Sequence, residues 1–237
     1  MSFDSFFWNA KVLLLPPKVE LSDSEKESIF LNDPVLQNHQ NMKRNFSMTT
    51  LAPTLYTRTF PRMAGWLRDV ILITVGALFV AILAQVKIPL PFTPVPLTGQ
   101  TFAVLLIAAV LGSKRGSASM AFYIALGTFG LPVFAGGAAG MAYLSGATFG
   151  YLIGFVLAAY VIGLLAERGL ERNIRTSVLP FLVGTVIIYA CGVSWLAILL
   201  GSFSKAVAAG LVPFVVGDII KLFAAALALP AAWKLVK

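Results

Sequence analysis

The stretch Val70-Ile-Leu-Ile-Thr-Val-Gly-Ala-Leu-Phe-Val-Ala-Ile-Leu-Ala-Gln-Val86 contains no charged residue, and Lys87 follows it directly. A helix needs about 17–25 mostly apolar residues to cross the hydrocarbon core of a membrane. The stretch therefore predicts a membrane-spanning helix. The whole 237-residue chain has the same character, with 58% hydrophobic and 12% charged residues and a mean hydropathy of +0.86. Soluble domains carry about 25% charged residues, so the composition predicts an integral membrane protein.

Further apolar runs bring the number of predicted spans to six, and acidic residues are concentrated before them. Seven of the ten acidic residues precede Val70. We therefore predict a polar leader over residues 1–65, flexible or dispensable, and an all-α bundle of six transmembrane helices over residues 66–237. The five other predicted spans are Thr98–Leu111 with its neighbours, Gly116–Phe134, Gly150–Ala166, Ser177–Ser204 and Val212–Trp233.

The basic residues lie mainly at one side of these predicted spans. One side receives ten of them and the other side only Lys87 and Lys205. Lysine and arginine are enriched on the cytoplasmic side of membrane proteins, so we expect a multi-pass protein of the plasma (inner) membrane with both termini in the cytoplasm. This placement also accounts for the net charge of +8, and we expect no nucleic-acid partner. The ten residues are Arg58, Arg62, Arg68, Lys114, Arg115, Arg168, Arg172, Arg175, Lys234 and Lys237.

Two of the predicted outward loops, the first and the third, have unusual compositions. The first lies within Lys87–Gln100, KIPLPFTPVPLTGQ, which has four prolines. Proline fixes φ and pushes its predecessor toward extended backbone, so we expect a stiff extended segment, which we call the strap. The third, Ala135–Phe149, is rich in glycine and alanine. It is either a plain turn between helices or a lid over an outward-facing site, where irregular backbone lines a cavity.

The membrane part offers little chemistry for catalysis. It has no phosphate-binding GxxxxGK[ST] motif, no HExxH and no Cys/His cluster, since Cys191 is the only cysteine and His39 the only histidine. We therefore expect neither an enzyme nor a metal site.

One charged pair stands in the last predicted span, Val215-Val-Gly-Asp-Ile-Ile-Lys221. Asp218 and Lys221 are three residues apart and so share a helix face. Charged residues in spans are costly and usually functional. Either the two charges only neutralise each other, or they anchor a small ligand that has N–H groups and a carbonyl or carboxylate.

Four motifs follow one another in the membrane part, namely KIPLPFTPVPLTGQT (87–101), GLPVFAGGAAG (130–140), GATFGYLIGF (146–155) and VVGDIIK (215–221). In this order they make the chain resemble the BioY family, the substrate-binding S components of energy-coupling factor (ECF) biotin transporters. The resemblance covers Trp66–Lys237. It implies a six-helix bundle that holds biotin near the outer face, beneath the first and third outward loops.

The resemblance also implies roles for particular residues. Asp218 would accept the ureido N–H groups of biotin, and Lys221 would serve an oxygen. Tyr151 and the preceding Gly150 match the family's glycine–tyrosine stretch in part, since Phe149 stands where the family usually has glycine. Three weaker substrate-binding candidates, which buried helix polarity explains about as well, are Gln100, Thr98 and Tyr143.

The chain has no ATP site, so energy for transport would come from partners. The resemblance implies two ATPase subunits, which alone use ATP, and a membrane coupling protein. We expect biotin as the ligand and no bound cofactor. Small residues in the first predicted span let another helix approach closely. Ala77 and Ala81 are therefore either internal packing positions or a docking face for the coupling protein.

An alternative function is a self-sufficient secondary transporter of a small carboxylate or vitamin, in which Asp218 and Lys221 relay protons. Against it, Asp218 is the only acidic residue within the predicted spans, and no inverted pair of broken helices is apparent.

Overall fold

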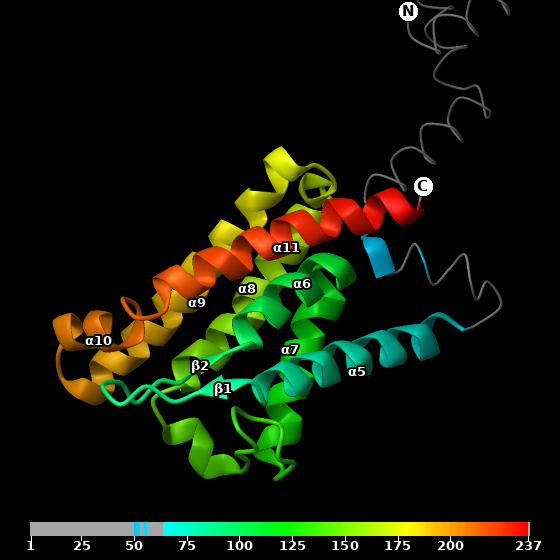
Figure 1. Cartoon of the computed structure of the whole chain (residues 1–237). Coiled ribbons are helices and arrows are strands. Elements are labelled where there is room, and N and C mark those ends of the chain that lie inside the picture. Colours follow the sequence, from blue (N-terminus) through cyan, green and yellow to red (C-terminus); the bar gives the residue numbers. More distant parts are fainter. Residues whose placement is uncertain (1–49, 53–54, 56–63, 237) are drawn as a thin grey trace, which may run out of the picture. The chain divides into compact units, whose positions relative to one another are not determined.

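The computed structural model describes residues 50–52, 55 and 64–236 (Figure 1). Most of the predicted leader therefore lies outside the described residues. Within it, Thr50 and Leu51 are buried, and Leu51 belongs to the hydrophobic core. Part of the chain before the first long helix is therefore packed, while the predicted boundary between residues 65 and 66 stays a prediction.

The described residues are mostly helical, with four helices long and apolar enough to cross a membrane, namely α5, α8, α9 and α11. The other two predicted spans are shorter, with 12 residues in α6 and 16 in α7. The α-helices are α5 (Gly65–Ala84), α6 (Gln100–Leu111), α7 (Ser113–Thr128), α8 (Phe149–Glu167), α9 (Ile174–Leu200), α10 (Phe203–Gly210) and α11 (Val215–Val236). Two short 3-10 helices are η1 (Met141–Ser145) and η2 (Leu170–Arg172).

The strap is not purely irregular, and this corrects the all-α prediction. Its ends form two short antiparallel strands, β1 (Lys87–Ile88) and β2 (Leu97–Thr98), with Lys87 opposite Thr98. The four prolines lie between the strands, where no ladder hydrogen bond requires their missing N–H. The strap therefore leaves α5 and returns to α6 as a hairpin.

The turn between α6 and α7 shifts the third predicted span. Gly112 has φ +84°, a conformation that favours glycine and interrupts the helix after α6. Helix α7 therefore begins at the next residue, Ser113, and not at Gly116 as predicted. Glu167 at the end of α8 then takes the place of a local cap. Its Oε1 accepts hydrogen bonds from the Ser113 N–H and hydroxyl, each at 2.8 Å. The short helix α10 connects the last two predicted spans.

Helix α8 lies at the centre of the helix bundle. Of its span window, 56% is buried, against 28–33% for α5, α9 and α11. Two glycines allow this close packing. A Cβ on Gly163 would lie 2.2 Å from the Ser113 nitrogen, and a Cβ on Gly154 would lie 2.9 Å from the Ile188 Cα. The helices that surround α8 therefore approach it at backbone distance.

Polar contacts join several helix ends at one end of the bundle. Asp69 near the start of α5 accepts from Arg115 Nε of α7 at 2.8 Å. Glu171 of η2 accepts from Trp233 Nε1 of α11 at 3.1 Å. The strap, β1, β2 and α10 gather at the other end (Figure 1), where Thr93 of the strap donates to the carbonyl of Ala209 at 2.6 Å. We call the end that holds Asp69, Arg115 and Glu171 the basic end, and the end that holds the strap and α10 the strap end.

The small residues of α5 are used inside the chain. Ala77 is 0% and Ala81 7% exposed, and a Cβ on the adjacent Gly76 would lie 2.6 Å from Ser119 Oγ of α7. Both alanines are therefore buried within the chain, and their role as a docking face for a partner stays a prediction.

Candidate functional site

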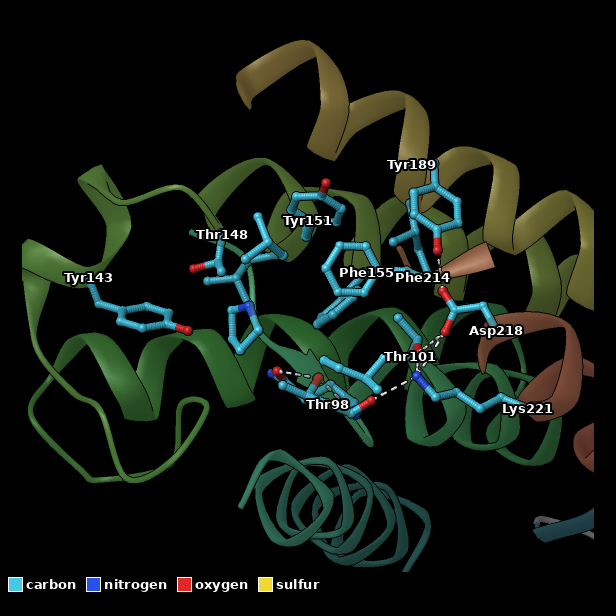
Figure 2. A pocket seen from close by; sticks show the side chains of 16 residues that line it. Thr98, Thr101, Tyr143, Thr148, Tyr151, Phe155, Tyr189, Phe214, Asp218 and Lys221 are labelled. Carbon is cyan, nitrogen blue, oxygen red and sulfur yellow. Dashed lines mark hydrogen bonds and ion pairs between the residues drawn. The ribbon is translucent and has the colours of Figure 1, made fainter. Parts of the chain in front are cut away.

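A pocket opens at the strap end, between the strap, α6, α8, α9 and α11 (Figure 2). It encloses about 530 Å³ of space between atoms, part of it open to solvent. The sixteen lining residues are Val95, Pro96, Leu97, Thr98, Gln100, Thr101, Tyr143, Thr148, Tyr151, Leu152, Phe155, Ile188, Tyr189, Phe214, Asp218 and Lys221.

Asp218 and Lys221 line one end of this pocket from the first two turns of α11. Lys221 Nζ donates to Asp218 Oδ1 at 2.8 Å, and Asp218 is only 6% exposed. The two charges therefore pair with each other and also face a cavity, and their role as an anchor for a ligand stays a prediction.

The Lys221 ammonium has no N–H left over. Besides Asp218, it donates to the carbonyl of Thr98 at 2.8 Å and to the hydroxyl of Thr101 at 3.0 Å. A lysine ammonium has three N–H donors, so these three acceptors use them all. Lys221 thus joins the end of the strap to α11 and holds the carboxylate in place.

The Asp218 carboxylate, by contrast, has an acceptor position to spare. Its Oδ1 accepts from Lys221 and from the Thr101 hydroxyl at 3.1 Å. Its Oδ2 accepts from the Tyr189 hydroxyl of α9 at 2.5 Å. Each carboxylate oxygen has about two lone-pair sites, which leaves one on Oδ2. This end of the pocket therefore suits a ligand N–H.

Thr98 and Gln100 belong to a chain of hydrogen bonds that holds the end of the strap. Thr98 donates to Gln100 Oε1 at 3.1 Å, Gln100 Nε2 donates to the Tyr123 hydroxyl at 2.8 Å, and Tyr123 donates to the carbonyl of Val133 at 3.1 Å. Buried polar groups bonded in series fix one another's orientation. The chain sets the backbone of Thr98, whose carbonyl receives Lys221.

Aromatic and aliphatic side chains form the walls between the polar end and the opening. Tyr151 contributes its ring, while its hydroxyl donates to the carbonyl of Gly210 at 2.6 Å. Phe155 of α8 and Phe214 before α11 complete this apolar section (Figure 2). Such walls suit an apolar ring system.

Tyr143 lies at the other end of the pocket, on η1, with its hydroxyl directed toward the middle (Figure 2). Its ring stacks on Phe134 with centroids 4.5 Å apart, and Phe134 meets Tyr123 edge to face. The segment that the sequence left as either a turn or a lid thus contributes Tyr143 and Thr148 to the lining of the pocket.

Gly150 is close to the pocket but does not line it. A Cβ there would lie 2.3 Å from the Trp195 Cβ and 2.5 Å from the Cys191 carbonyl oxygen. The glycine therefore lets α8 and α9 approach, which places Tyr151 correctly. The structure brings the other six proposed substrate-binding residues to one cavity.

Sequence reasoning did not select Tyr189 and Thr101, which complete the Asp218 environment. Each is a polar residue in an apolar run, and that signal is shared with several residues that lie elsewhere. Among the described residues, no group of three or more His, Cys, Asp or Glu side chains is placed to hold a metal ion. The acceptor position left on Asp218 favours recognition of an uncharged N–H group at this end of the pocket.

Comparisons with known proteins identify the family of this chain. The sequence profile of the BioY family matches residues 47–237. The biotin transporter BioY of Thermotoga maritima is 45% identical over 156 residues, which cover 66% of this chain and 91% of the relative. The probable biotin transporter BioY of Pyrococcus horikoshii is 42% identical over 150 residues, covering 63% of this chain and 88% of the relative.

A solved structure has the same fold. The crystal structure of the S-component for biotin from an ECF-type ABC transporter matches with a TM-score of 0.66 and 26% identity, covering 73% of this chain and 95% of that one. The profile match extends over far more than half of the sequence. The chain therefore belongs to the BioY family, a family of transporters and not of enzymes.

Proposed function

We propose that this chain binds biotin in the strap-end pocket and serves as the S component of an ECF-type ABC importer. The observation that carries the proposal is the Asp218–Lys221 pair, which closes the inner end of an apolar pocket in a BioY-family chain. Biotin has two ureido N–H groups, an apolar thioether ring and a carboxylate. The spare lone pair of Asp218 accepts a ureido N–H, and the Tyr151, Phe155 and Phe214 walls hold the rings.

The proposed role of Lys221 differs from the sequence-based expectation that it serves a ligand oxygen. Since its three N–H donors are occupied, Lys221 orients Asp218 and offsets its charge. Gln100 and Thr98 position the strap, and Tyr143 covers the pocket mouth.

The proposed membrane arrangement has six spans with both termini in the cytoplasm. Here α6 and α7 are the two shorter spans, with α6 about 18 Å long at 1.5 Å per residue. The strap reaches into the outer part of the bilayer and supplies the remaining thickness. Positive charge at the basic end, including Arg115 and Arg172, supports a cytoplasmic location for that end.

The proposed partners are two ATPase subunits and a membrane coupling protein, as the family membership and the ECF-type structural relative suggest. Because Ala77 and Ala81 are buried, docking at those residues requires a change in the packing of α5 against its neighbours. Because the ATPase subunits supply the energy in this proposal, uptake of biotin by cells that express this chain should depend on them.

The test of substrate binding is equilibrium titration of the purified, detergent-solubilised chain with biotin. We expect one site per chain, and a loss of about 2 kcal/mol or more in Asp218→Asn and in Lys221→Ala, because each change leaves a buried polar partner unsatisfied. Asp69→Asn, at the basic end, is the matched control and should bind as the wild type does. A folded wild-type chain that does not bind biotin contradicts the proposal.

The alternative function is tested in vesicles that contain this chain alone. Biotin uptake driven by a proton gradient, with no ATPase present, would favour a secondary transporter. Saturable binding without uptake supports the S-component role.

A further inference from the structure

A second cavity lies beside the pocket, between the strap and the segment around η1. It encloses about 800 Å³ of space between atoms, part of it open to solvent, and Lys87 and Thr93 of the strap help to line it. Pro96, Tyr143 and Thr148 line both this outer cavity and the pocket. The two spaces therefore meet at these three side chains and form one path from the surface to Asp218.

The two spaces differ in charge. In the pocket, Asp218 and Lys221 form an ion pair, so their formal charges cancel. The outer cavity is lined by one ammonium group, that of Lys87, and by no carboxylate. Within the part of the chain that the structure describes, no ion pair is formed by Lys87. The outer cavity is thus electropositive and has no counter-ion of its own.

The position of Lys87 is set from two sides. In the hairpin it pairs with Thr98, whose carbonyl receives Lys221. Its side chain lies along the backbone of Gly136, since a Cβ there would be 2.6 Å from Lys87 Cδ and 3.3 Å from Nζ. Gly136, with φ +69°, is itself held by its N–H, which donates to the carbonyl of Ala84 at 3.1 Å. The ammonium is therefore kept at the wall of the outer cavity.

Binding of a ligand carboxylate at the Asp218 end of the pocket would be unfavourable. Next to Asp218 it would meet a like charge in a poorly hydrated site, which is unfavourable. It would also find no unused N–H on Lys221. In the outer cavity, a carboxylate would meet an unpaired ammonium and keep contact with water.

We propose that the outer cavity receives the carboxylate end of the transported ligand, with Lys87 as its counter-ion, while the N–H-bearing end faces Asp218. This inference rests on the proposed function, because it takes a small elongated carboxylate as the ligand. It makes Lys87 a specificity-determining residue: the site distinguishes an acid from its neutral derivatives through a charge on the strap.

The experiment measures binding of biotin and of its primary amide, which has nearly the same shape and no charge, to the full chain in detergent. Lys87→Gln should weaken biotin binding about three- to fivefold, the size expected for a solvent-accessible ion pair, and leave binding of the amide unchanged. Lys87→Glu should weaken biotin binding further and spare the amide. Lys87→Arg should keep the preference for the acid. Lys205→Gln, which removes a lysine of α10 that lines neither cavity, is the matched control.

The amide reports on the integrity of the pocket within each variant. Equal loss for acid and amide in Lys87→Gln would show a structural role only and overturn the inference. Unchanged binding of both by Lys87→Gln, with a wild type that binds biotin, would overturn it as well and leave the proposed function intact. A wild type that binds neither ligand would contradict the proposed function, and this inference with it.

Discussion

Two buried carboxylates, Asp218 at the strap end and Glu171 at the basic end, have opposite kinds of surroundings. Both oxygens of Asp218 are hydrogen-bonded, and Lys221 supplies a positive charge at 2.8 Å. Glu171 is 0% exposed, and its Oε1 accepts from Trp233 Nε1 at 3.1 Å. Its Oε2 is buried with no hydrogen-bond partner among the described residues.

This difference shows how much a buried acid depends on its partners. Burial raises the pKa of the Glu171 carboxyl to about 7, although Arg172 with its Nε at 3.7 Å and the Trp233 N–H oppose the rise. A buried charge is tolerated only where opposite charge and hydrogen bonds replace water. Asp218 has both an opposite charge and hydrogen bonds, and it borders a cavity. Glu171, on η2, contacts Trp233 of α11 and borders none of the cavities described above.

The largest effect should follow removal of the cation at the strap end. Lys221→Ala leaves Asp218 buried without its counter-charge, so we expect a loss of about 3–5 kcal/mol of stability. Asp218→Asn with Lys221→Met removes both charges, and should lose less stability than the single Lys221→Ala while still failing to bind biotin. Thermal unfolding in detergent and biotin titration measure the two effects separately. Equal stability of the single and double variants would show that an unpaired Asp218 carboxylate does not destabilise the folded chain.

At the basic end, stability should fall as pH rises. The unfolded carboxyl of Glu171 has a pKa near 4.5 and the folded one near 7, so between these values the folded state holds more protons and loses stability with increasing pH. The change over this window is up to about 3 kcal/mol. Glu171→Gln should remove this slope and melt higher than the wild type at pH 8.

Thermal unfolding of wild type and Glu171→Gln across pH 5–8 checks this prediction. Taking the difference between the two cancels the titration of other acids. Parallel curves for the two proteins would mean that Glu171 titrates in the folded state as it does in water.

A smaller effect is expected from packing beside the pocket. Gly150→Ala forces its new methyl against Trp195 and the Cys191 carbonyl, which should cost about 1–3 kcal/mol of stability and weaken biotin binding through Tyr151. Gly217→Ala is the matched control, because its new methyl would meet only Leu97 Cδ1 at an ordinary 3.7 Å. A Gly150→Ala chain as stable as Gly217→Ala would show that α8 and α9 are not in close contact there.

The smallest effect concerns the ion pair between Asp69 and Arg115, which is 2.8 Å long like the one at Asp218. The side chain of Asp69 is 40% exposed, so water already solvates it. Asp69→Asn should therefore change stability by less than about 1 kcal/mol. A loss as large as that of Lys221→Ala would mean that distance, and not burial, governs these pairs.

Several features were predictable from local sequence. The apolar runs predicted the four long helices, with ends displaced by a few residues. The prolines of the strap predicted extended backbone, although pairing of its ends as β1 and β2 was not foreseen. The spacing of Asp218 and Lys221 placed both on one helix face, as the ion pair confirms.

The failures share a physical cause. In a lipid environment, apolar side chains suit both the lipid-facing and the protein-facing side of a helix, so hydropathy does not tell which side is buried. For that reason the sequence left open whether Ala77 and Ala81 face the chain's own helices. The role of Gly150 in contact between α8 and α9 was hidden in the same way.

The sequence by itself determined that this chain is a helical membrane protein, which residues carry its intramembrane charge, and that its strap is extended, because these depend on composition and on short-range geometry. Only the tertiary structure decided that Tyr189 of α9 and Thr98 beside α6 complete the surroundings of Asp218 and Lys221, and that Lys87 faces a separate cavity. Those contacts join residues far apart in the chain, and they depend on the rotation and depth of each helix against its neighbours, which no local pattern encodes.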